Sequence, residues 1–299
     1  MTKTMLTYDI CFVGHYTKDT IVSSSGPEAR TRVVDGGACH YGAHVAARMG
    51  LKTAVVTRMA EEDLHVAEEM RQLGVDVFVR TTPQSTCLRL VYPTVNVDQR
   101  TIYVTSTAGP FTPAEVEGIQ ARAFCIGASM RGEVNVEVVE ELARKDTVLA
   151  ADVQSFLRVN RDGVLIPEAW PEKEQVLAHL DVLKTDAVEA ELLTGESDIE
   201  VAAKKAAGLG PREIVLTHRD GLLVYAQGQF HQAGFFPKKL VGRSGRGDTC
   251  IASYLAKRLS ASPQEATTWA AAVTSLKMEA EGPFRRTIHE VEKLIDRMY

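Results

Sequence analysis

The chain has 299 residues, of which 45% are hydrophobic and 24% are charged, and these proportions exclude a disordered or fibrous protein. Its length exceeds the usual size of one core but is too short for three domains, which predicts a single large domain, residues 1–299, with a modest appendage. The formal net charge of -5 provides no field that would attract nucleic acid or an anionic membrane, so any phosphate binding must be local.

Short apolar runs rich in β-branched residues alternate along the chain with longer stretches of helical periodicity. Strands are predicted at 10–13, 54–56, 75–79, 148–153, 182–183 and 214–216, and helices at 41–50, 61–73, 134–144, 197–208, 249–260, 265–280 and 287–298. This alternation is typical of parallel strands joined by helical crossovers. We therefore expect an α/β fold with a mostly parallel central sheet.

Two stretches depart from this rhythm and read as extended segments, residues 20–34 and 87–105, the second with a turn at 96–99. Their apolar residues alternate loosely, as expected of a layer with one covered and one exposed face. We predict that about 17–35 and 86–107 form a small β-sheet inserted into the α/β domain. Such a layer would act as a hinged lid over a ligand cleft or as a subunit contact, and the second use predicts a homodimer through the lid.

The cysteines are odd in number and widely spaced, without a Cys-x-x-Cys pair that would indicate zinc or redox chemistry. The first residues lack the apolar core of a signal peptide, and no apolar run reaches the length of about 18 residues that a membrane helix needs. We expect a cytoplasmic protein with reduced thiols and with neither a membrane nor a nucleic acid as partner.

A glycine-rich loop at 242–248 leads directly into an amphipathic helix. Its glycines, at 242, 245 and 247, permit positive φ and close approach of the backbone, and amides at a helix start form an anion site. Asp248 lies in the first turn, where a carboxylate is either a helix cap or a reactive group, and spacing alone does not separate the two. The order Gly-x-x-Gly-x-Gly-Asp is neither a Walker A sequence nor the Gly-x-Gly-x-x-Gly of dinucleotide-binding folds.

This loop resembles the C-terminal signature of the ribokinase (PfkB) family of carbohydrate kinases, Asp-Thr-Thr-Gly-Ala-Gly-Asp followed by a helix, with Gly245, Gly247 and Asp248 at matching positions. The resemblance implies a ribokinase-like three-layer α/β/α sandwich with a small β-sheet lid, and a kinase that moves the γ-phosphate of ATP to a hydroxyl. It also implies that Asp248 takes the hydroxyl proton and that the amides of residues 245–248 bind the phosphoryl charge. Positioning, fixed dipoles and a metal ion can supply most of such catalysis.

Two positions of the loop depart from the family signature. Gly242 replaces the leading Asp, which weakens the expectation of a bound monovalent cation. Arg246 replaces the middle Ala and puts a guanidinium where phosphate charge develops, so that it either stabilises that charge or points to solvent or an acidic neighbour.

A second family landmark is an Asn-x-x-Glu at a helix start that helps hold Mg²⁺, and Asp186 and Glu189 resemble it with Asp in place of Asn. Magnesium prefers oxygen ligands, whereas without the family frame the pair reads as a solvated acidic first turn. The resemblance also implies nucleotide contacts at Lys184, Thr217, Arg219, Gly221 and Ser275.

The acceptor contacts implied by the resemblance come from three segments and comprise Asp19, Gly36, Gly37, Tyr41, Asp152, Gln154 and Arg158. The two adjacent glycines match a sugar-binding turn, which otherwise reads as an ordinary loop. Asp152 follows a buried strand, and polar residues at the carboxyl end of a strand commonly line a ligand crevice. Arg158 is either a phosphate contact or a surface ion pair.

The family landmarks appear in the expected order from Asp19 to Ser275, so the resemblance covers nearly the whole chain. Details such as Tyr41 and Arg158 look most like the myo-inositol kinase branch, which predicts a cyclitol such as myo-inositol as the acceptor. A nucleoside kinase of the same fold and a catalytically silent ligand-binding relative are the alternatives, because the fold does not choose among them.

Overall fold

The computed structural model describes residues 6–23, 30–94, 100–242 and 244–299. Nine strands form a central sheet in the order β15-β14-β13-β12-β9-β8-β1-β4-β5. They are β1 (Leu6–Val13), β4 (Thr53–Ala60), β5 (Asp76–Thr82), β8 (Ile119–Ile126), β9 (Val148–Asp152), β12 (Val182–Asp186), β13 (Glu213–Thr217), β14 (Gly221–Ala226) and β15 (Gln229–Gly234). All neighbours pair in parallel except at β14 and β15, which continue the sheet as an antiparallel hairpin.

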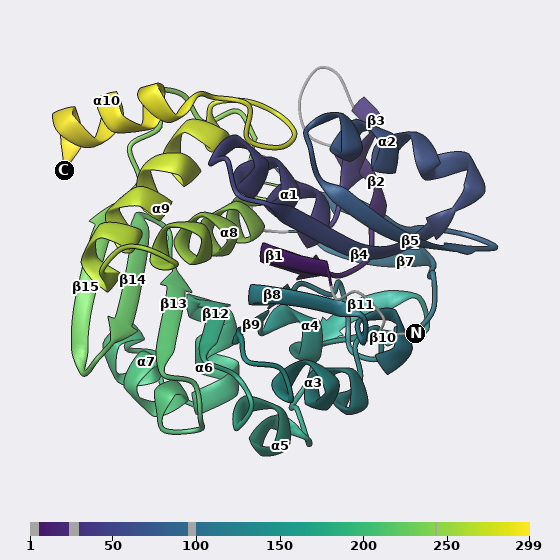
Figure 1. Ribbon diagram of the computed structural model, residues 1–299, viewed down its shortest axis with the longest axis horizontal. Helices are drawn as coiled ribbons and strands as arrows, with labels where there is room; N and C mark the ends of the chain where they lie inside the picture. The colour runs from purple at the N-terminus through teal and green to yellow at the C-terminus, as the bar shows by residue number, and fades with distance from the viewer. Residues whose placement is uncertain (1–5, 24–29, 95–99, 243) are drawn as a thin grey trace.

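Helices cover both faces of this sheet, which makes the main body a three-layer α/β/α sandwich (Figure 1). One face packs against α1 (Ala38–Arg48), α2 (Leu64–Gln72), α8 (Arg246–Arg258), α9 (Pro263–Met278) and α10 (Ile288–Met298). The other packs against α3 (Val136–Ala143), α5 (Lys173–Leu177), α6 (Ala187–Thr194) and α7 (Ile199–Ala207). Burial on both faces explains why the sheet strands read as continuous apolar runs, such as the fully buried β4.

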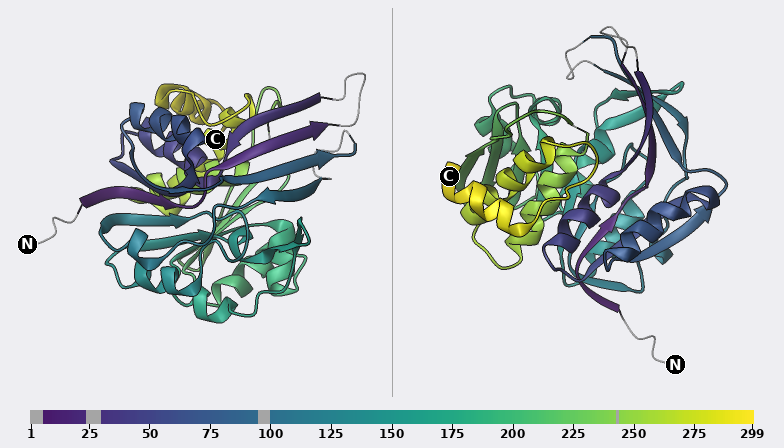
Figure 2. Two further views of the ribbon diagram at one scale, coloured as in Figure 1. Left: turned by 90° about the vertical axis from the view of Figure 1, so that its right-hand side faces the viewer. Right: turned by 90° about the horizontal axis from the view of Figure 1, so that it is seen from above.

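A second sheet of six strands, here called the lid sheet, has the order β10-β11-β7-β6-β2-β3. Its strands are β2 (Thr17–Ser23), β3 (Arg30–Gly36), β6 (Thr86–Tyr92), β7 (Thr101–Ser106), β10 (Arg158–Arg161) and β11 (Val164–Pro167). Figure 2 shows β2 and β3 extending away from the main body. Asp19 pairs with Leu88, and Leu90 pairs with Ile102, so these side chains share one face of the lid sheet.

The predicted α/β class is confirmed, and each of the predicted strands and helices lies within or overlaps an observed one. The two extended segments do pair with each other, through β2, β3, β6 and β7. The turn expected at 96–99 lies outside the described residues. Sequence reasoning missed β8, the β10–β11 hairpin and the antiparallel β14–β15 hairpin. Polar residues interrupt the apolar pattern of β8, β10 and β15, whereas β14 is an apolar run that was overlooked.

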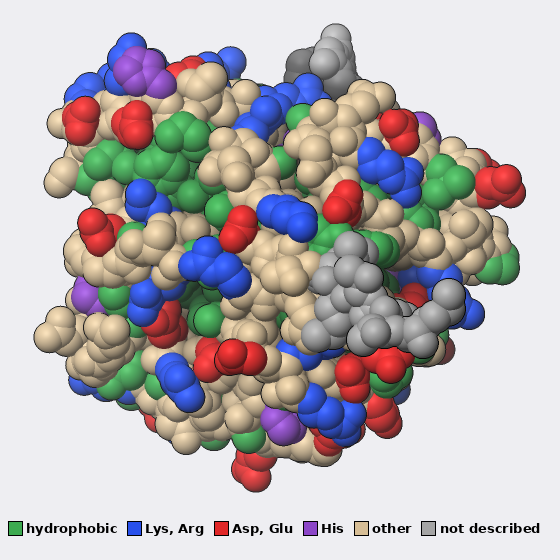
Figure 3. All heavy atoms as spheres, in the orientation of Figure 1, with side chains coloured by type: hydrophobic (Ala, Val, Ile, Leu, Met, Phe, Trp, Pro, Cys, Tyr) green, Lys and Arg blue, Asp and Glu red, His purple; other side chains and the backbone are tan. Residues whose placement is uncertain are grey.

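Within the described residues, no helix combines the length and the apolar composition that crossing a membrane would require. Basic and acidic side chains are interspersed over the face that Figure 3 shows, in keeping with the modest net charge of -5. This face therefore has no large patch of one sign that would attract a polyelectrolyte.

Candidate active site

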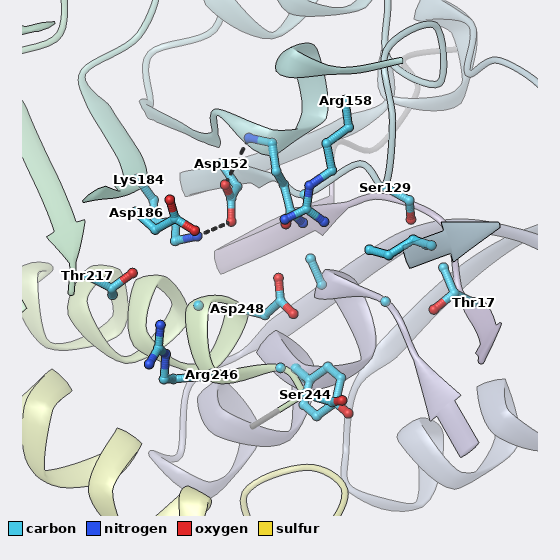
Figure 4. Close-up of a pocket in the computed structure, with 18 of the residues that line it drawn as sticks. Thr17, Ser129, Asp152, Arg158, Lys184, Asp186, Thr217, Ser244, Arg246 and Asp248 are labelled. Atoms are coloured by element: carbon cyan, nitrogen blue, oxygen red, sulfur yellow. Dashed lines mark hydrogen bonds and ion pairs between the residues drawn. The ribbon is translucent and has the colours of Figure 1, made fainter. Parts of the chain in front are cut away.

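A cavity of about 520 Å³ lies where the carboxyl ends of the parallel strands meet the lid sheet (Figure 4). Three neighbouring strands end there on polar residues, β9 on Asp152, β12 on Asp186 and β13 on Thr217. Crevices at the carboxyl ends of strands are the usual ligand sites of open α/β sheets. Most of the predicted site residues line the cavity: Asp19, Gly37, Tyr41, Asp152, Gln154, Arg158, Lys184, Asp186, Thr217, Arg219, Gly245, Arg246, Gly247 and Asp248.

The loop before α8 contains two glycines that the packing requires. Gly245 has φ +73°, and a Cβ there would lie 2.3 Å from the Tyr41 ring; a Cβ at Gly247 would lie 2.7 Å from Lys184 Nζ. Gly245 is the N-cap of α8, and no side chain of the described residues caps this helix. Asp248 is therefore not a cap, and the first amides of α8 stay available to an anion in the cavity.

Asp248 projects into the middle of the cavity, with the guanidinium of Arg158 above it in Figure 4. Burial raises the pKa of its carboxyl, while the charges of Lys184, Arg158 and Lys277 oppose the rise. A buried carboxylate with an elevated pKa that faces a cavity is suited to accept a proton.

Lys184 and Asp152 form a buried ion pair at 2.9 Å, with side-chain exposures of 5% and 2%. Burial opposes the charge on Lys184, but the carboxylates of Asp152, Glu189 and Asp186 raise its pKa overall. Asp152 Oδ1 also accepts a hydrogen bond from the Gln154 amide at 3.1 Å. The pair therefore holds a permanent ammonium at the wall of the cavity.

Asp186 and Glu189 form a capping box at the start of α6. The Glu189 amide donates to Asp186 Oδ1 at 2.8 Å, and the Asp186 amide donates to Glu189 Oε2 at 3.1 Å. Arg158 Nη2 donates to Glu189 Oε1 at 3.2 Å. Glu189 is buried and does not line the cavity, so the pair of acidic residues is not a solvated helix turn. Arg158 lines the cavity and also binds Glu189.

The residues predicted to hold Mg²⁺ fit that role unequally. Both oxygens of Glu189 already accept hydrogen bonds from described residues, whereas Asp186 lines the cavity itself. No group of three or more His, Cys, Asp or Glu suited to a metal occurs in the described part of the chain. Magnesium commonly binds through one or two carboxylates together with substrate phosphates, and of the two predicted residues Asp186 fits that pattern.

The lid end of the cavity is built around Asp19. A Cβ on Gly36 would lie 2.6 Å from both Asp19 Oδ2 and Thr17 Oγ1, so Gly36 makes room for these side chains although it does not line the cavity. Asp19 Oδ1 is buried and accepts no hydrogen bond from the described residues. Burial raises the pKa of Asp19 to about 6, although the hydrogen bond with the Thr17 hydroxyl acts to lower it. Its free oxygen is available to a hydroxyl group of a ligand.

Two of the residues predicted to contact a nucleoside lie outside the cavity. Gly221 begins β14 and pairs with Gly234 of β15, and Ser275 is fully buried in α9. The Phe236 amide donates to Ser275 Oγ at 2.9 Å, and Tyr299 Oη donates to the Gly234 carbonyl at 2.5 Å. The Phe236 and Tyr299 rings pack edge to face, 5.2 Å between centroids. Gly221 and Ser275 are therefore engaged by other parts of the chain and do not face the cavity.

A model of the pfkB family of carbohydrate kinases matches residues 7–286. The chain belongs to this family. No curated protein matches it by sequence. The PfkB chain is similar to a pyrophosphate-dependent kinase in the ribokinase family, complexed with a pyrophosphate analog and myo-inositol (35% identity, TM-score 0.87, covering 95% of this chain and 99% of that one).

A second structure similar to this PfkB chain is that of a pyrophosphate-dependent myo-inositol-1 kinase converted into a myo-inositol-3 kinase by two substitutions to leucine. It is 34% identical, with a TM-score of 0.86, and the match covers 97% of this chain and 100% of that one. Ribokinase from Arabidopsis thaliana, complexed with ribose and ATP, is 19% identical with a TM-score of 0.76 over 97% of this chain and 99% of that one, and supports the fold alone.

As a PfkB carbohydrate kinase the chain is a sugar or polyol kinase. Sequence reasoning missed the cavity residues Thr17, Leu88, Leu90, Arg100, Ile102, Ser129 and Ser244. The lid residues could have been found from the strand alternation that puts Leu88 and Leu90 on one face, had the covered face been known. Ser129 follows β8, which the sequence did not reveal.

Proposed function

We propose that this kinase transfers a phosphoryl group from inorganic pyrophosphate to a hydroxyl of myo-inositol or a related cyclitol. The pyrophosphate-dependent kinases at 34–35% identity motivate the donor, and their myo-inositol names motivate the acceptor. ATP, which the family resemblance implies, is the competing donor.

The boundary of the cavity is the observation that carries the choice of donor. Lining residues reach Thr217 and Arg219 but include neither Gly221, which pairs with Gly234, nor Ser275, which accepts a hydrogen bond from the Phe236 amide. This end of the cavity is bordered by Lys184, Arg246 and the first amides of α8. Cations and helix amides recognise phosphate groups without any contact to a nucleoside, so this end suits a short polyphosphate.

The acceptor end combines hydrogen-bonding groups with an apolar wall. Asp19 offers an unsatisfied oxygen, and the lid sheet contributes Leu88, Leu90 and Ile102. A cyclitol carries a ring of hydroxyls around a carbon framework, so the carboxylate would accept from its hydroxyls while the leucines contact the ring carbons.

In the proposed reaction Asp248 accepts the proton of the attacking hydroxyl. The oxygen forms a bond to phosphorus, the bond to the bridging oxygen breaks, and orthophosphate leaves with the electron pair. Lys184, Arg158 and Arg246 balance the charge of the donor, and the amides of residues 245–248 receive the charge of the transferred group. A Mg²⁺ ion anchored by Asp186 would neutralise phosphate charge when bound.

Two further properties are part of the proposal. A homodimer would form through the outer face of the lid sheet, which exposes Val33 and Tyr103. The cytoplasm would be the compartment, since the cysteines are free thiols and four of the five are buried.

The proposed function is tested by following phosphate species with ³¹P NMR while the purified protein is incubated with Mg²⁺, myo-inositol and either pyrophosphate or ATP. Pyrophosphate should be consumed with equal formation of orthophosphate and an inositol monophosphate. ATP should react at least about tenfold more slowly, since the proposed donor end recognises phosphate groups without a contact to a nucleoside. Ribose and a nucleoside serve as the comparison acceptors.

Turnover with ATP but not with pyrophosphate would reject the proposed donor. Faster phosphorylation of ribose or of the nucleoside than of myo-inositol would reject the proposed acceptor.

A further inference from the structure

Lys277 is a buried lysine in the last turn of α9, and its side chain is directed into the loop that precedes α8. Only 2% of the residue is exposed. Its Nζ donates to the carbonyl of Gly242 at 3.4 Å and to the carbonyl of Ser244, and it lies 5.4 Å from the centre of the Tyr41 ring. The ammonium is thus held by two carbonyls of one loop and by the face of an aromatic ring.

The environment of this ammonium is costly for the fold. Among the described residues the hydrogen-bond acceptors of Lys277 are backbone carbonyls and not carboxylates, and buried charges without a carboxylate partner are unfavourable. Burial lowers its pKa to about 8, although the charge of Asp248 opposes the change. An apolar side chain of similar length would fill the same space without this cost, so packing alone does not account for a lysine at this position.

The loop is attached to the end of α9 in both directions. The amides of Val241 and Gly242 donate to the Met278 carbonyl at 2.9 and 3.2 Å. A Cβ on Gly242 would lie 2.8 Å from the Ala280 carbonyl, so the loop approaches the segment that follows α9 as closely as only glycine allows. The Met278 carbonyl thus accepts hydrogen bonds from the loop, and the Lys277 ammonium donates hydrogen bonds to it. Together these contacts fix the path by which the loop enters α8.

The contact with Ser244 determines the direction of the next amide. In a trans peptide the C=O and the following N–H point in opposite directions, so a Ser244 carbonyl drawn toward Lys277 turns the Gly245 N–H away from it. Gly245 lines the cavity, whereas Lys277 does not. The Gly245 N–H donates no hydrogen bond to another described residue. At this wall of the cavity the Gly245 N–H is therefore turned away from Lys277 and has no acceptor among the described residues.

We propose that Lys277 is a positioning residue for phosphoryl transfer, whose ammonium orients the Ser244–Gly245 peptide so that the Gly245 amide meets the transferred phosphoryl group. Lys277 itself touches neither donor nor acceptor. The inference rests on the proposed phosphoryl transfer at this cavity but not on the identity of the donor.

The test uses three variants of the full chain, Lys277→Met, Lys277→Ala and, as matched control, Lys257→Met. Lys257 also places an ammonium over an aromatic ring, 4.6 Å from the centre of Trp269, but lies outside the cavity lining. Loss of one donor of an oxyanion hole lowers kcat by about 10²-fold or more, so Lys277→Met should lose on the order of 10²-fold in kcat with KM for the acceptor unchanged. Lys257→Met should keep wild-type kinetics.

Chemical rescue separates positioning from a merely structural role. Ammonium or methylammonium should enter the space left in Lys277→Ala and restore kcat by about tenfold or more, while Lys277→Met, whose side chain fills that space, should not respond. The melting temperature of Lys277→Met should equal or exceed that of the wild type, because a buried charge has been removed.

An unchanged kcat in Lys277→Met, or a loss explained entirely by a lower melting temperature and unaffected by ammonium, would overturn the proposal. Failure of the wild type to turn over pyrophosphate would reject the proposed donor instead, and the variant series would then be run with ATP. If neither donor reacts, calorimetric titration with pyrophosphate decides: weaker binding to Lys277→Met supports the positioning of the amide, and equal binding rejects it.

Discussion

At the scale of single residues, Asp248 is defined by its neighbours more than by its place in the sequence. Its carboxyl lies in the first turn of α8 without capping it, because Gly245 is the N-cap. Burial raises its pKa, and the cations Lys184 and Arg158 keep the charged form accessible. A carboxyl balanced in this way can hold a proton briefly and release it, which a solvated aspartate does poorly.

Replacement of Asp248 by Asn should abolish most of the turnover while pyrophosphate binding persists. A general base contributes about 10²- to 10⁴-fold, so we expect a loss of kcat in that range and a dissociation constant that does not increase, as measured by steady-state kinetics and calorimetry. Asp220→Asn, on the exposed loop that follows β13, is the matched control and should remain active. Near-normal turnover of Asp248→Asn would remove this residue from the role of base.

The same residue predicts how activity depends on pH. Because the pKa of Asp248 is raised, the carboxylate that must accept the proton is lost as the pH falls, at a pH above the usual value of about 3.9 for aspartate. The acidic limb of a kcat/KM profile should therefore lie above that value. An acidic limb at or below it would contradict the assignment.

Among the secondary-structure elements, the β14–β15 hairpin and the segment that follows it lie beyond Thr217 and Arg219, the residues that line the proposed donor end. Gly221 and Gly234 pair at the end of the hairpin, and Phe236 and Tyr299 pack over this point. Both aromatic residues are partly exposed, at 37% and 42%, so they form a cover at the surface and not a part of the core. A cover of two rings can be removed with less damage than a core residue would cause.

Combined replacement of Phe236 and Tyr299 by Ala should increase the use of ATP relative to pyrophosphate. Opening room for a base and ribose should change the ratio of kcat/KM values by about tenfold or more, a range typical of altered pocket contacts. Phe230→Ala is the control, because Phe230 packs on Tyr225 of the same hairpin, 5.0 Å between ring centroids, away from the cavity. An unchanged ratio in the double variant would show that these rings do not exclude the nucleoside.

At the scale of the whole molecule, the lid sheet has two faces with different surroundings. One face carries Leu88, Leu90 and Ile102 toward the cavity. The other carries Val33 and Tyr103, which the register Val33–Thr20–Arg89–Tyr103 puts on a common side. Val33 is 60% exposed and lies on the edge strand β3, whose outer backbone groups pair with no strand of the described residues. Apolar side chains beside an open sheet edge favour association with a second copy.

Light scattering after size-exclusion chromatography should therefore give a mass of twice the 32.7 kDa of one chain. The combined variant Val33→Glu and Tyr103→Glu should shift the mass to that of a monomer, because a dimer would juxtapose like charges. Val201→Glu, at a position that is 47% exposed on α7, should leave the mass unchanged. A monomeric wild type would reject the dimer.

The fold class and the chemical character of the loop before α8 could both be predicted from local sequence patterns. Continuous β-branched runs and helical periodicity are local properties, so β4 and α9 could be predicted without their neighbours. The glycines at 245 and 247 were equally legible, because few residues tolerate positive φ or so close an approach of other groups.

The extent of the cavity and the partner of each polar group became visible in the folded chain alone. Strand β8 was hidden, because Gln120 and Arg122 interrupt its apolar pattern at one end of a buried strand. Glu189 proved to be engaged by Arg158, Ser275 proved to be covered by Phe236, and Lys277 proved to hold the loop beside Asp248. These pairings join residues 31 to 39 positions apart, and contacts at such separations depend on how the chain returns to itself, which local patterns do not encode.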